Sequence, residues 1–192
     1  MKLGIIIGSI REGRLSDRLA KCIDGVAKAK DIDSKILDLK EFNLPFFNEA
    51  RSPQANPDRQ PSENIKAWLT AVGECDAIVL VSPEYNRSYS PVLKNALDHL
   101  AFEIKRKPVL LASHGSTGGA QAVSHLRGML AGLQAITIPP AVMIVGSLAE
   151  IINENGEVSD ELKSQPYGPP TMIGNALDEL KWFSDSLAQA RS

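Results

Sequence analysis

Short apolar segments alternate with amphipathic helical patterns along this chain, and that alternation constrains the fold more than any other feature. Residues 3–8 (LGIIIG), 76–82 (DAIVLVS) and 108–113 (PVLLAS) are too short for helices and are rich in Val, Ile and Leu, so we predict strands buried on both faces. Residues 34–39 (SKILDL) and 135–146 (AITIPPAVMIVG) supply two further strands.

Apolar residues at helical spacing occupy the intervals between these strands. The groups are Leu15, Leu19, Ile23 and Val26; Ile65, Trp68, Leu69 and Val72; Val123, Leu126, Leu130 and Leu133; and Ile173, Leu177, Leu180, Phe183 and Leu187. Pro91 is expected to open one more helix at its first turn. Parallel strands need crossover connections, which helices usually supply, so the pattern predicts an α/β fold with helices on both faces of the sheet.

A chain of 192 residues suits one domain, and we expect a single domain over residues 1–192. Its sheet is expected to be doubly wound and five-stranded, with the order 2-1-3-4-5. Ligands of such sheets bind beyond the carboxyl ends of the strands, where the direction of winding switches. The loops after the first, third and fourth strands are therefore the candidate site.

Charge and cysteine content exclude several classes of partner. The number of Lys plus Arg residues (21) nearly equals that of Asp plus Glu (23), and the sequence has no basic run with interleaved aromatic residues that could bind along a phosphate backbone. We therefore expect no nucleic acid partner. The N-terminal apolar stretch is too short for a secretory core or a membrane span, which favours a cytoplasmic protein without membrane contact. Cys22 and Cys75 lack metal-ligand spacing, so we expect buried reduced thiols and no metal site.

Two segments interrupt the alternation. Residues 40–61 contain four prolines, Pro45, Pro53, Pro57 and Pro61, so an extended connection is expected before a helix that begins near Ser62. Residues 146–170 are rich in Asp and Glu and contain an Asn155-Gly156 turn signal, which predicts an exposed acidic excursion whose role the sequence leaves open.

The loop from Gly8 to Ala20 (GSIREGRLSDRLA) has features of an anion site. Its small residues allow backbone N–H groups to face an anion at a helix N-terminus, and it offers the side chains of Ser9, Arg11, Arg14 and Ser16. Neither GxGxxG nor GxxxxGK[ST] is present, and Cys22 lies inside the helix rather than in the loop, so a dinucleotide fingerprint, a triphosphate loop and a cysteine phosphatase are disfavoured. The alternative is a surface turn with solvated arginines.

The other two loops offer the walls of a pocket for a flat heterocycle. After the third strand, Pro83 stiffens the exit, and the amides of Glu84, Tyr85 and Asn86 are positioned to meet a polar ring edge. The alternative places Tyr85 and Tyr89 in the core. After the fourth strand comes a glycine-rich turn that permits close approach of main chain to a ligand, built from Gly115, Ser116, Thr117, Gly118 and Gly119. His114, next to this turn, is expected to be a hydrogen-bonded structural residue rather than an acid–base catalyst.

These three stretches together resemble the NAD(P)H-dependent FMN reductase family, which has a flavodoxin-like fold and includes quinone, azo-dye and chromate reductases. PEYN followed by LKNALD is the most specific signature, and the resemblance covers nearly the whole chain. It implies that Ser9, Arg11, Arg14 and Ser16 hold the FMN phosphate while Pro83, Glu84, Tyr85, Asn86, Arg87 and residues 115–119 frame the isoalloxazine. Arg14 stands where many members have serine, and Arg87 where glycine or histidine is common.

The resemblance also implies a function. An FMN-dependent oxidoreductase would take hydride from NADPH or NADH and reduce a quinone, azo compound, free flavin or metal oxyanion by a ping-pong mechanism, with no catalytic side chain. The alternative is a flavodoxin-like electron carrier or redox-regulated binding protein. A homodimer or homotetramer is implied, in which the helix bearing Leu93, Leu97 and Leu100 packs against its counterpart, although these leucines could equally face their own sheet.

Overall fold

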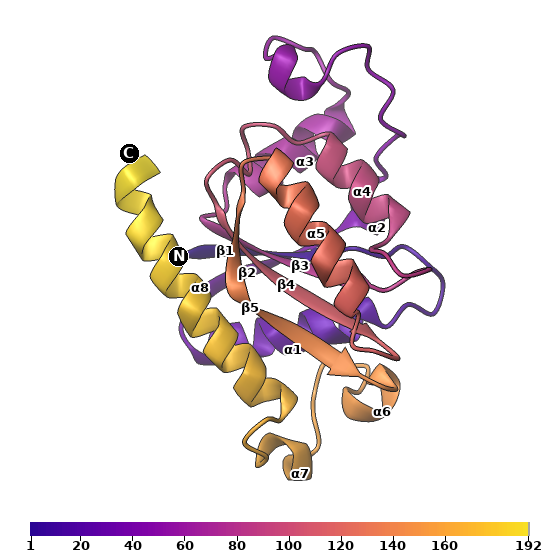
Figure 1. Cartoon of the computed structure of the whole chain (residues 1–192), viewed down its shortest axis with the longest axis vertical. Coiled ribbons are helices and arrows are strands. Elements are labelled where there is room, and N and C mark those ends of the chain that lie inside the picture. Colours follow the sequence, from indigo (N-terminus) through magenta and orange to yellow (C-terminus); the bar gives the residue numbers. More distant parts are fainter. Residues whose placement is uncertain (192) are drawn as a thin grey trace.

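All five predicted strands form one parallel sheet in the computed structural model, which describes residues 1–191 (Figure 1). The order is β2-β1-β3-β4-β5, as the sequence predicted. The strands are β1 (Lys2–Ile7), β2 (Asp33–Asp38), β3 (Ala77–Pro83), β4 (Pro108–Gly115) and β5 (Ile136–Val145). Because every strand points the same way, all the loops that follow strands leave from one edge of the sheet.

The predicted helices lie on both faces of this sheet. They are α1 (Ser16–Ala29), α3 (Glu63–Gly73), α4 (Pro91–Asp98), α5 (Ala120–Gly132) and α8 (Pro169–Arg191). Four short elements that the sequence did not predict are α2 (Leu39–Phe42), η1 (Pro53–Ala55), α6 (Leu148–Ile151) and α7 (Asp160–Lys163).

Successive residues of the central strands enter two separate cores. Ile5 and Ile7 of β1 pack with α1 and α8, whereas Ile6 between them packs with α3, α4 and α5. This alternation follows from the two-residue period of a strand, and it explains why the central strands are apolar throughout.

The α4 leucines face their own sheet. Leu93, Leu97 and Leu100 are buried within the core that α3, α4 and α5 share with the sheet. A subunit interface made by these three side chains is therefore excluded, and any interface on α4 must use its other face.

The segment 146–170 is not simply an exposed excursion, and that prediction is wrong in part. Its carboxylates are exposed, but Leu148, Ile152 and Val158 are buried against the core beneath α1 and α8. Ile152 and Val158 form an antiparallel bridge around the predicted Asn155-Gly156 turn, and Lys21 Nζ donates to the backbone oxygen of Glu154 at 2.8 Å. The apolar residues interspersed among the acids anchor this segment to the domain.

The connection 40–61 is extended only in part, because the end of α2 and the η1 turn lie within it, and it reaches α3 directly after Ser62 as predicted (Figure 1). It is attached to α4 through Asn95, which accepts from the amide of Phe47 at 2.8 Å and donates to the oxygen of Pro45 at 2.9 Å, and to the C-cap His99, whose Nε2 lies 3.0 Å from the same oxygen. Asn95 therefore positions this connection beside the carboxyl edge of the sheet.

Both cysteines are buried and free, as expected. Burial raises the pKa of the Cys22 thiol to about 11, so this group is a poor nucleophile. Among residues 1–191, no helix combines the length and the apolar character needed to cross a bilayer.

Candidate functional site

Hydrogen bonds join the loops after β1 and β3 at the carboxyl edge of the sheet. Ser9 Oγ lies 2.8 Å from the Tyr85 hydroxyl, and the Arg11 guanidinium carbon lies 5.0 Å from the centre of the Tyr85 ring. Ser90 Oγ donates to the oxygen of Gly8 and accepts from the amide of Leu93 at 3.2 Å, so this one side chain both caps α4 and fixes the start of the first loop.

The loop after β4 is joined to the first loop through a buried pair. Ser16, the first residue of α1, places its Oγ 2.9 Å from His114 Nε2. Burial lowers the pKa of His114 to about 4, so its imidazole is neutral near neutral pH. His114 is hydrogen-bonded, as the sequence suggested, and its partner Ser16 links β4 to the N-terminus of α1.

Arg14 is held by Asp38 at the end of β2. The two side chains form a two-pronged ion pair, and Arg14 Nη1 also donates to the oxygen of Ser9 at 2.6 Å. The hydrogen bond to Asp38 raises the pKa of Arg14 above its already high value. A guanidinium has five N–H donors, and these contacts use three, so two remain to meet an anion.

The N-terminus of α1 has no side-chain cap. Leu15 precedes the helix and makes no capping bond, in contrast to Ser90 before α4 and Asp38 before α2. Gly13 has a φ of +65°, which favours glycine, and a Cβ there would meet nothing within 4 Å, so the residue serves the backbone turn of the loop rather than a close contact. The Arg18 amide is used by Leu15 O (3.1 Å) and Asp17 Oδ1 (3.0 Å), so the amides of Ser16 and Asp17, together with Arg11 and Arg14, are the groups here that could hold an anion.

The loop after β3 is a tight hairpin turn. Tyr85 and Ser88 exchange backbone hydrogen bonds of 2.8 and 3.0 Å, and the two residues between them, Asn86 and Arg87, both have positive φ (49° and 63°). This is the pattern of a type I′ turn, in which asparagine is well suited to the first central position but arginine is strained at the second. Both central side chains are exposed, and Pro83 is buried at the strand end.

Glu84 connects this turn to the glycine-rich loop. Its carboxylate accepts from the amides of Gln121 (3.0 Å) and Ala122 (3.4 Å) and so occupies the N-terminus of α5. Gly118 and Gly119 both have positive φ, and a Cβ on Gly119 would lie only 1.7 Å from Ser113 Oγ, so only glycine fits there. Ser116 and Thr117 are exposed at the tip of the loop.

A cavity of about 360 Å³ lies against the first two loops. Its lining is mostly apolar and includes Ile10, Tyr85 and Phe46, with Arg11 at one side. A crevice with apolar walls and few polar groups is typical of sites that bind flat organic molecules.

The structure thus brings the three predicted loops together and adds residues that the sequence analysis did not select. Asp38 and Ser90 hold the first loop, and Asn95 holds the connection beside it. A carboxylate near the end of the predicted strand 34–39 was the only signal for Asp38. Within residues 1–191 there is no cluster of three or more His, Cys, Asp or Glu side chains able to hold a metal ion.

A doubly wound five-stranded parallel sheet with joined loops at its carboxyl edge defines a flavodoxin-like protein. Residues 1–149 match the NADPH-dependent FMN reductase family, and the chain belongs to that family. It is therefore a flavin-dependent oxidoreductase, of a family that uses FMN with NAD(P)H as electron donor.

Known proteins from several organisms are similar to this chain in sequence or in fold. An NAD(P)H-dependent FMN reductase of Schizosaccharomyces pombe is 32% identical over 188 residues, with 88% of this chain and 94% of the relative covered. An FMN-dependent NADPH-azoreductase of Staphylococcus saprophyticus is 35% identical over 144 residues, covering 74% of this chain and 76% of the relative. In structure, a flavoenzyme NAD(P)H:(acceptor) oxidoreductase of Paracoccus denitrificans superposes with a TM-score of 0.75 at 23% identity, covering 96% of this chain and 97% of that one.

Proposed function

We propose that this chain is one FMN-binding domain that takes hydride from NADPH or NADH and reduces a small acceptor by a ping-pong mechanism. Quinones, azo compounds, free flavin and metal oxyanions are the acceptor classes. The observation that carries the proposal is the N-terminus of α1, where no side chain of the preceding loop caps the helix and where two arginines stand in a loop fixed by hydrogen bonds to its neighbours. The one carboxylate of the first turn, Asp17, accepts from the Arg18 amide at 3.0 Å and leaves the amides of Ser16 and Asp17 for a ligand.

The residues at this edge fit FMN. A phosphate at the α1 N-terminus meets main-chain amides, the guanidinium of Arg11 and the two remaining N–H donors of Arg14, and the dipole of α1 favours its charge. Ser9 and Ser16 are buried and already bonded to Tyr85 and His114, so we assign them to the phosphate loop as residues that also hold its shape.

The isoalloxazine is assigned to the space between the turn at 83–87 and the loop at 115–119. The amides of Glu84 and Tyr85, which the sequence suggested as donors, already donate to the oxygens of His114 (3.3 Å) and Ser88 (2.8 Å), so Asn86 and Arg87 supply the amides for the polar ring edge. The positive φ values of Gly118 and Gly119 allow main chain to approach the ring closely. Bound FMN supplies the redox chemistry, so no catalytic side chain is needed. Glu84 holds the turn at 83–87 next to the loop at 115–119 through its hydrogen bond to the Gln121 amide at the start of α5.

A single crevice that serves both substrates leads to ping-pong kinetics, because the oxidised nicotinamide must leave before the acceptor can reach the same ring. Assembly as a homodimer or homotetramer would use a surface other than the buried α4 leucines, and exposed Phe102, which follows α4, supports it. The two free buried cysteines support a cytoplasmic location.

Absorption spectroscopy tests the proposal. The purified protein, after incubation with FMN and gel filtration, is expected to be yellow with a flavin spectrum, and anaerobic NADPH is expected to bleach it rapidly. Addition of a quinone to the bleached protein is then expected to restore the yellow colour. A yellow protein that NADPH does not bleach would support the electron-carrier alternative, and a protein that retains no FMN would overturn the proposal. Initial rates that require both substrates to be bound at once would contradict the ping-pong step.

A further inference from the structure

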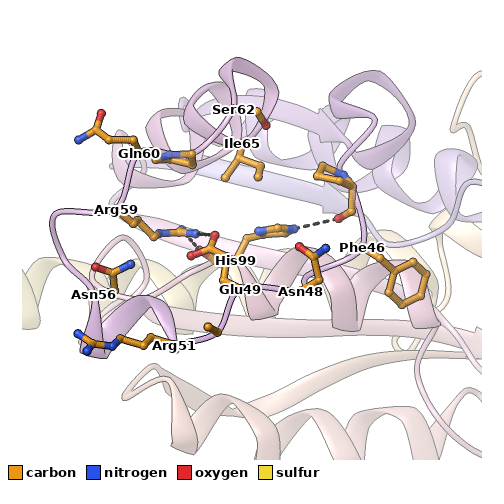
Figure 2. A pocket seen from close by; sticks show the side chains of 13 residues that line it. Phe46, Asn48, Glu49, Arg51, Asn56, Arg59, Gln60, Ser62, Ile65 and His99 are labelled. Carbon is orange, nitrogen blue, oxygen red and sulfur yellow. Dashed lines mark hydrogen bonds and ion pairs between the residues drawn. The ribbon is translucent and has the colours of Figure 1, made fainter.

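Phe46 lies at the surface in a stretch of chain that is fixed on both sides of it. The residue is 81% exposed and belongs to the connection between β2 and α3. Figure 2 shows its ring pointing away from the Glu49, Arg59 and His99 side chains, which lie around a neighbouring cavity of about 650 Å³. A single exposed apolar side chain is ordinary, but one whose backbone is anchored is held at a fixed place.

Buried side chains of α4 and its C-cap anchor the residues before and after Phe46. Asn95 accepts from the Phe47 amide at 2.8 Å and donates to the Pro45 oxygen at 2.9 Å. His99 Nε2 lies 3.0 Å from the same oxygen, and the His99 ring packs edge-on against the Phe47 ring with the centroids 5.4 Å apart. Asn95 and His99 are 8% and 1% exposed, so water competes little for these contacts. The backbone at Phe46 is therefore fixed while its ring faces outward.

Phe46 forms one wall of the 360 Å³ cavity beside the loops after β1 and β3. The apolar part of its lining consists of Ile10, Leu44, Phe46, Tyr85, Pro91 and Val92. Tyr85 belongs to the turn at 83–87 that we assign to the isoalloxazine, so a molecule in this cavity lies next to the proposed flavin site. The volume suits a small organic molecule, since such sites commonly measure about 300–1,000 Å³.

The polar side chains of this cavity are already engaged within the fold. Ser90 Oγ bonds to two backbone groups, Asn95 holds the connection, and the Tyr85 hydroxyl lies 2.8 Å from Ser9 Oγ. Among the described residues of the lining, Arg11 alone carries a formal charge, and its guanidinium lies over the Tyr85 ring. A metal oxyanion would lose its hydration here and find few donors in return, whereas a flat aromatic ring loses little.

From these observations we infer that Phe46 is a specificity-determining residue, which stacks on flat aromatic acceptors and so favours them over metal oxyanions. Stacking of two aromatic rings strengthens binding by about two- to tenfold beyond the burial of area. Asn95 and His99 act as positioning residues, because they hold the backbone on either side of Phe46. The inference rests on the proposed function, and it narrows the proposed acceptor classes to those with a planar ring.

Calorimetric titration with 2-methyl-1,4-naphthoquinone tests the site without turnover, because the oxidised FMN-loaded protein is used without NADPH. Phe46→Ala is expected to weaken quinone binding by about fivefold or more, since it removes both the stacking and the apolar wall. Phe46→Tyr keeps the ring and should bind the quinone within a factor of about two of the parent. Tyr167→Ala is the matched control, because Tyr167 is 85% exposed but lies in the segment 146–170, and it should leave binding unchanged.

Steady-state selectivity gives an independent measurement. With NADPH as donor, the ratio of kcat/KM for the quinone to kcat/KM for chromate should fall by about fivefold or more in Phe46→Ala. Asn95→Ala should lower the same ratio, because Phe46 is then no longer held in place. A general loosening of the protein would lower both values together and leave the ratio unchanged, which would overturn the positioning role of Asn95.

The outcomes separate this inference from the proposed function. If a yellow protein that NADPH bleaches binds the quinone equally well with and without the Phe46 ring, the inference is wrong and the proposed function stands. If Phe46→Ala lowers the molecular mass in light scattering and leaves quinone binding unchanged, Phe46 belongs to a subunit interface and the inference is again wrong. A protein whose quinone binding depends on Phe46 but which retains no FMN would support the aromatic site and overturn the proposed function.

Discussion

Arg14 and Asp38 form a bidentate ion pair that attaches the loop after β1 to the end of β2. Their side chains are 14% and 15% exposed, and Arg14 also donates to the backbone oxygen of Ser9, so the pair fixes the path of the loop. Asp38 contributes a second contact, because its Oδ1 accepts from the amide of Lys40 at 2.9 Å and caps α2. The loop that we propose for the FMN phosphate is therefore shaped before any ligand arrives.

Asp38→Asn tests this arrangement, because asparagine keeps the cap of α2 but removes the charge opposite Arg14. We expect a loss of about 2 kcal/mol in the free energy of unfolding, since a partly buried cation loses its counter-charge. FMN affinity should fall by several-fold because the loop is less fixed. Urea denaturation and quenching of FMN fluorescence measure the two effects.

The exposed ion pair between Lys181 and Asp185 provides the control for that substitution. Asp185→Asn should cost less than about 0.5 kcal/mol and leave FMN binding unchanged, because surface pairs contribute little. An Asp38→Asn protein as stable as the parent, with the same FMN affinity, would show that the pair does not hold the loop.

The strands, the sheet order and the three loops could be predicted from sequence because each depends on a local pattern. The partner of Arg14 could not, because Asp38 lies 24 residues away and comes near only through the pairing of β1 with β2, in which Ile7 stands opposite Asp38. The orientation of Leu93 was equally undetermined, because an amphipathic helix shows which face is buried but not which surface covers it.

The acidic segment shows a different limit of sequence patterns. Charge composition predicted exposure over 146–170 and was right for the carboxylates, yet Leu148, Ile152 and Val158 are buried. These residues are spaced too irregularly for a helix or strand period, so their burial depends on the surface that α1 and α8 provide.

Arg87→Gly is expected to stabilise the protein. Arg87 occupies the second central position of the Tyr85–Ser88 turn with a φ of +63°, where a side chain is strained and glycine is not. The gain should be about 0.5–1 kcal/mol, since the relieved strain is partly offset by the greater freedom of glycine in the unfolded chain. Thermal and urea unfolding measure it. Arg87→Ala removes the same charge but keeps the strain, so an equal gain in both variants would rule out this explanation.

Protonation of His114 should destabilise the fold at acidic pH. Burial lowers its pKa from 6.5 to about 4 in the folded protein, so between these values the unfolded chain binds the proton more readily. This contribution to stability is complete above pH 6.5 and is lost as the pH falls toward 4, amounting to about 2.5 kcal/mol by pH 4.5. Urea denaturation at pH 7 and pH 4.5 measures the difference for the parent and for His114→Gln. A loss of the same size in both proteins would assign the pH dependence to other groups.

Gly119→Ala should be strongly destabilising, and a second glycine of the same helix provides the matched control. At Gly119, φ is +76° and a Cβ would lie 1.7 Å from Ser113 Oγ and 2.6 Å from Ser113 Cβ, so the loop or β4 must move at a cost of about 2–4 kcal/mol. At Gly128, inside α5, a Cβ meets nothing within 4 Å, and alanine should add about 0.5–1 kcal/mol to the free energy of unfolding through its higher helix propensity.

Unfolding of both variants, with an FMN titration of each, compares the two sites. FMN affinity should fall only for Gly119→Ala, because the loop that it distorts is the proposed wall of the isoalloxazine site. If both alanines were tolerated equally, close approach of main chain at Gly119 would have no part in the fold or in flavin binding.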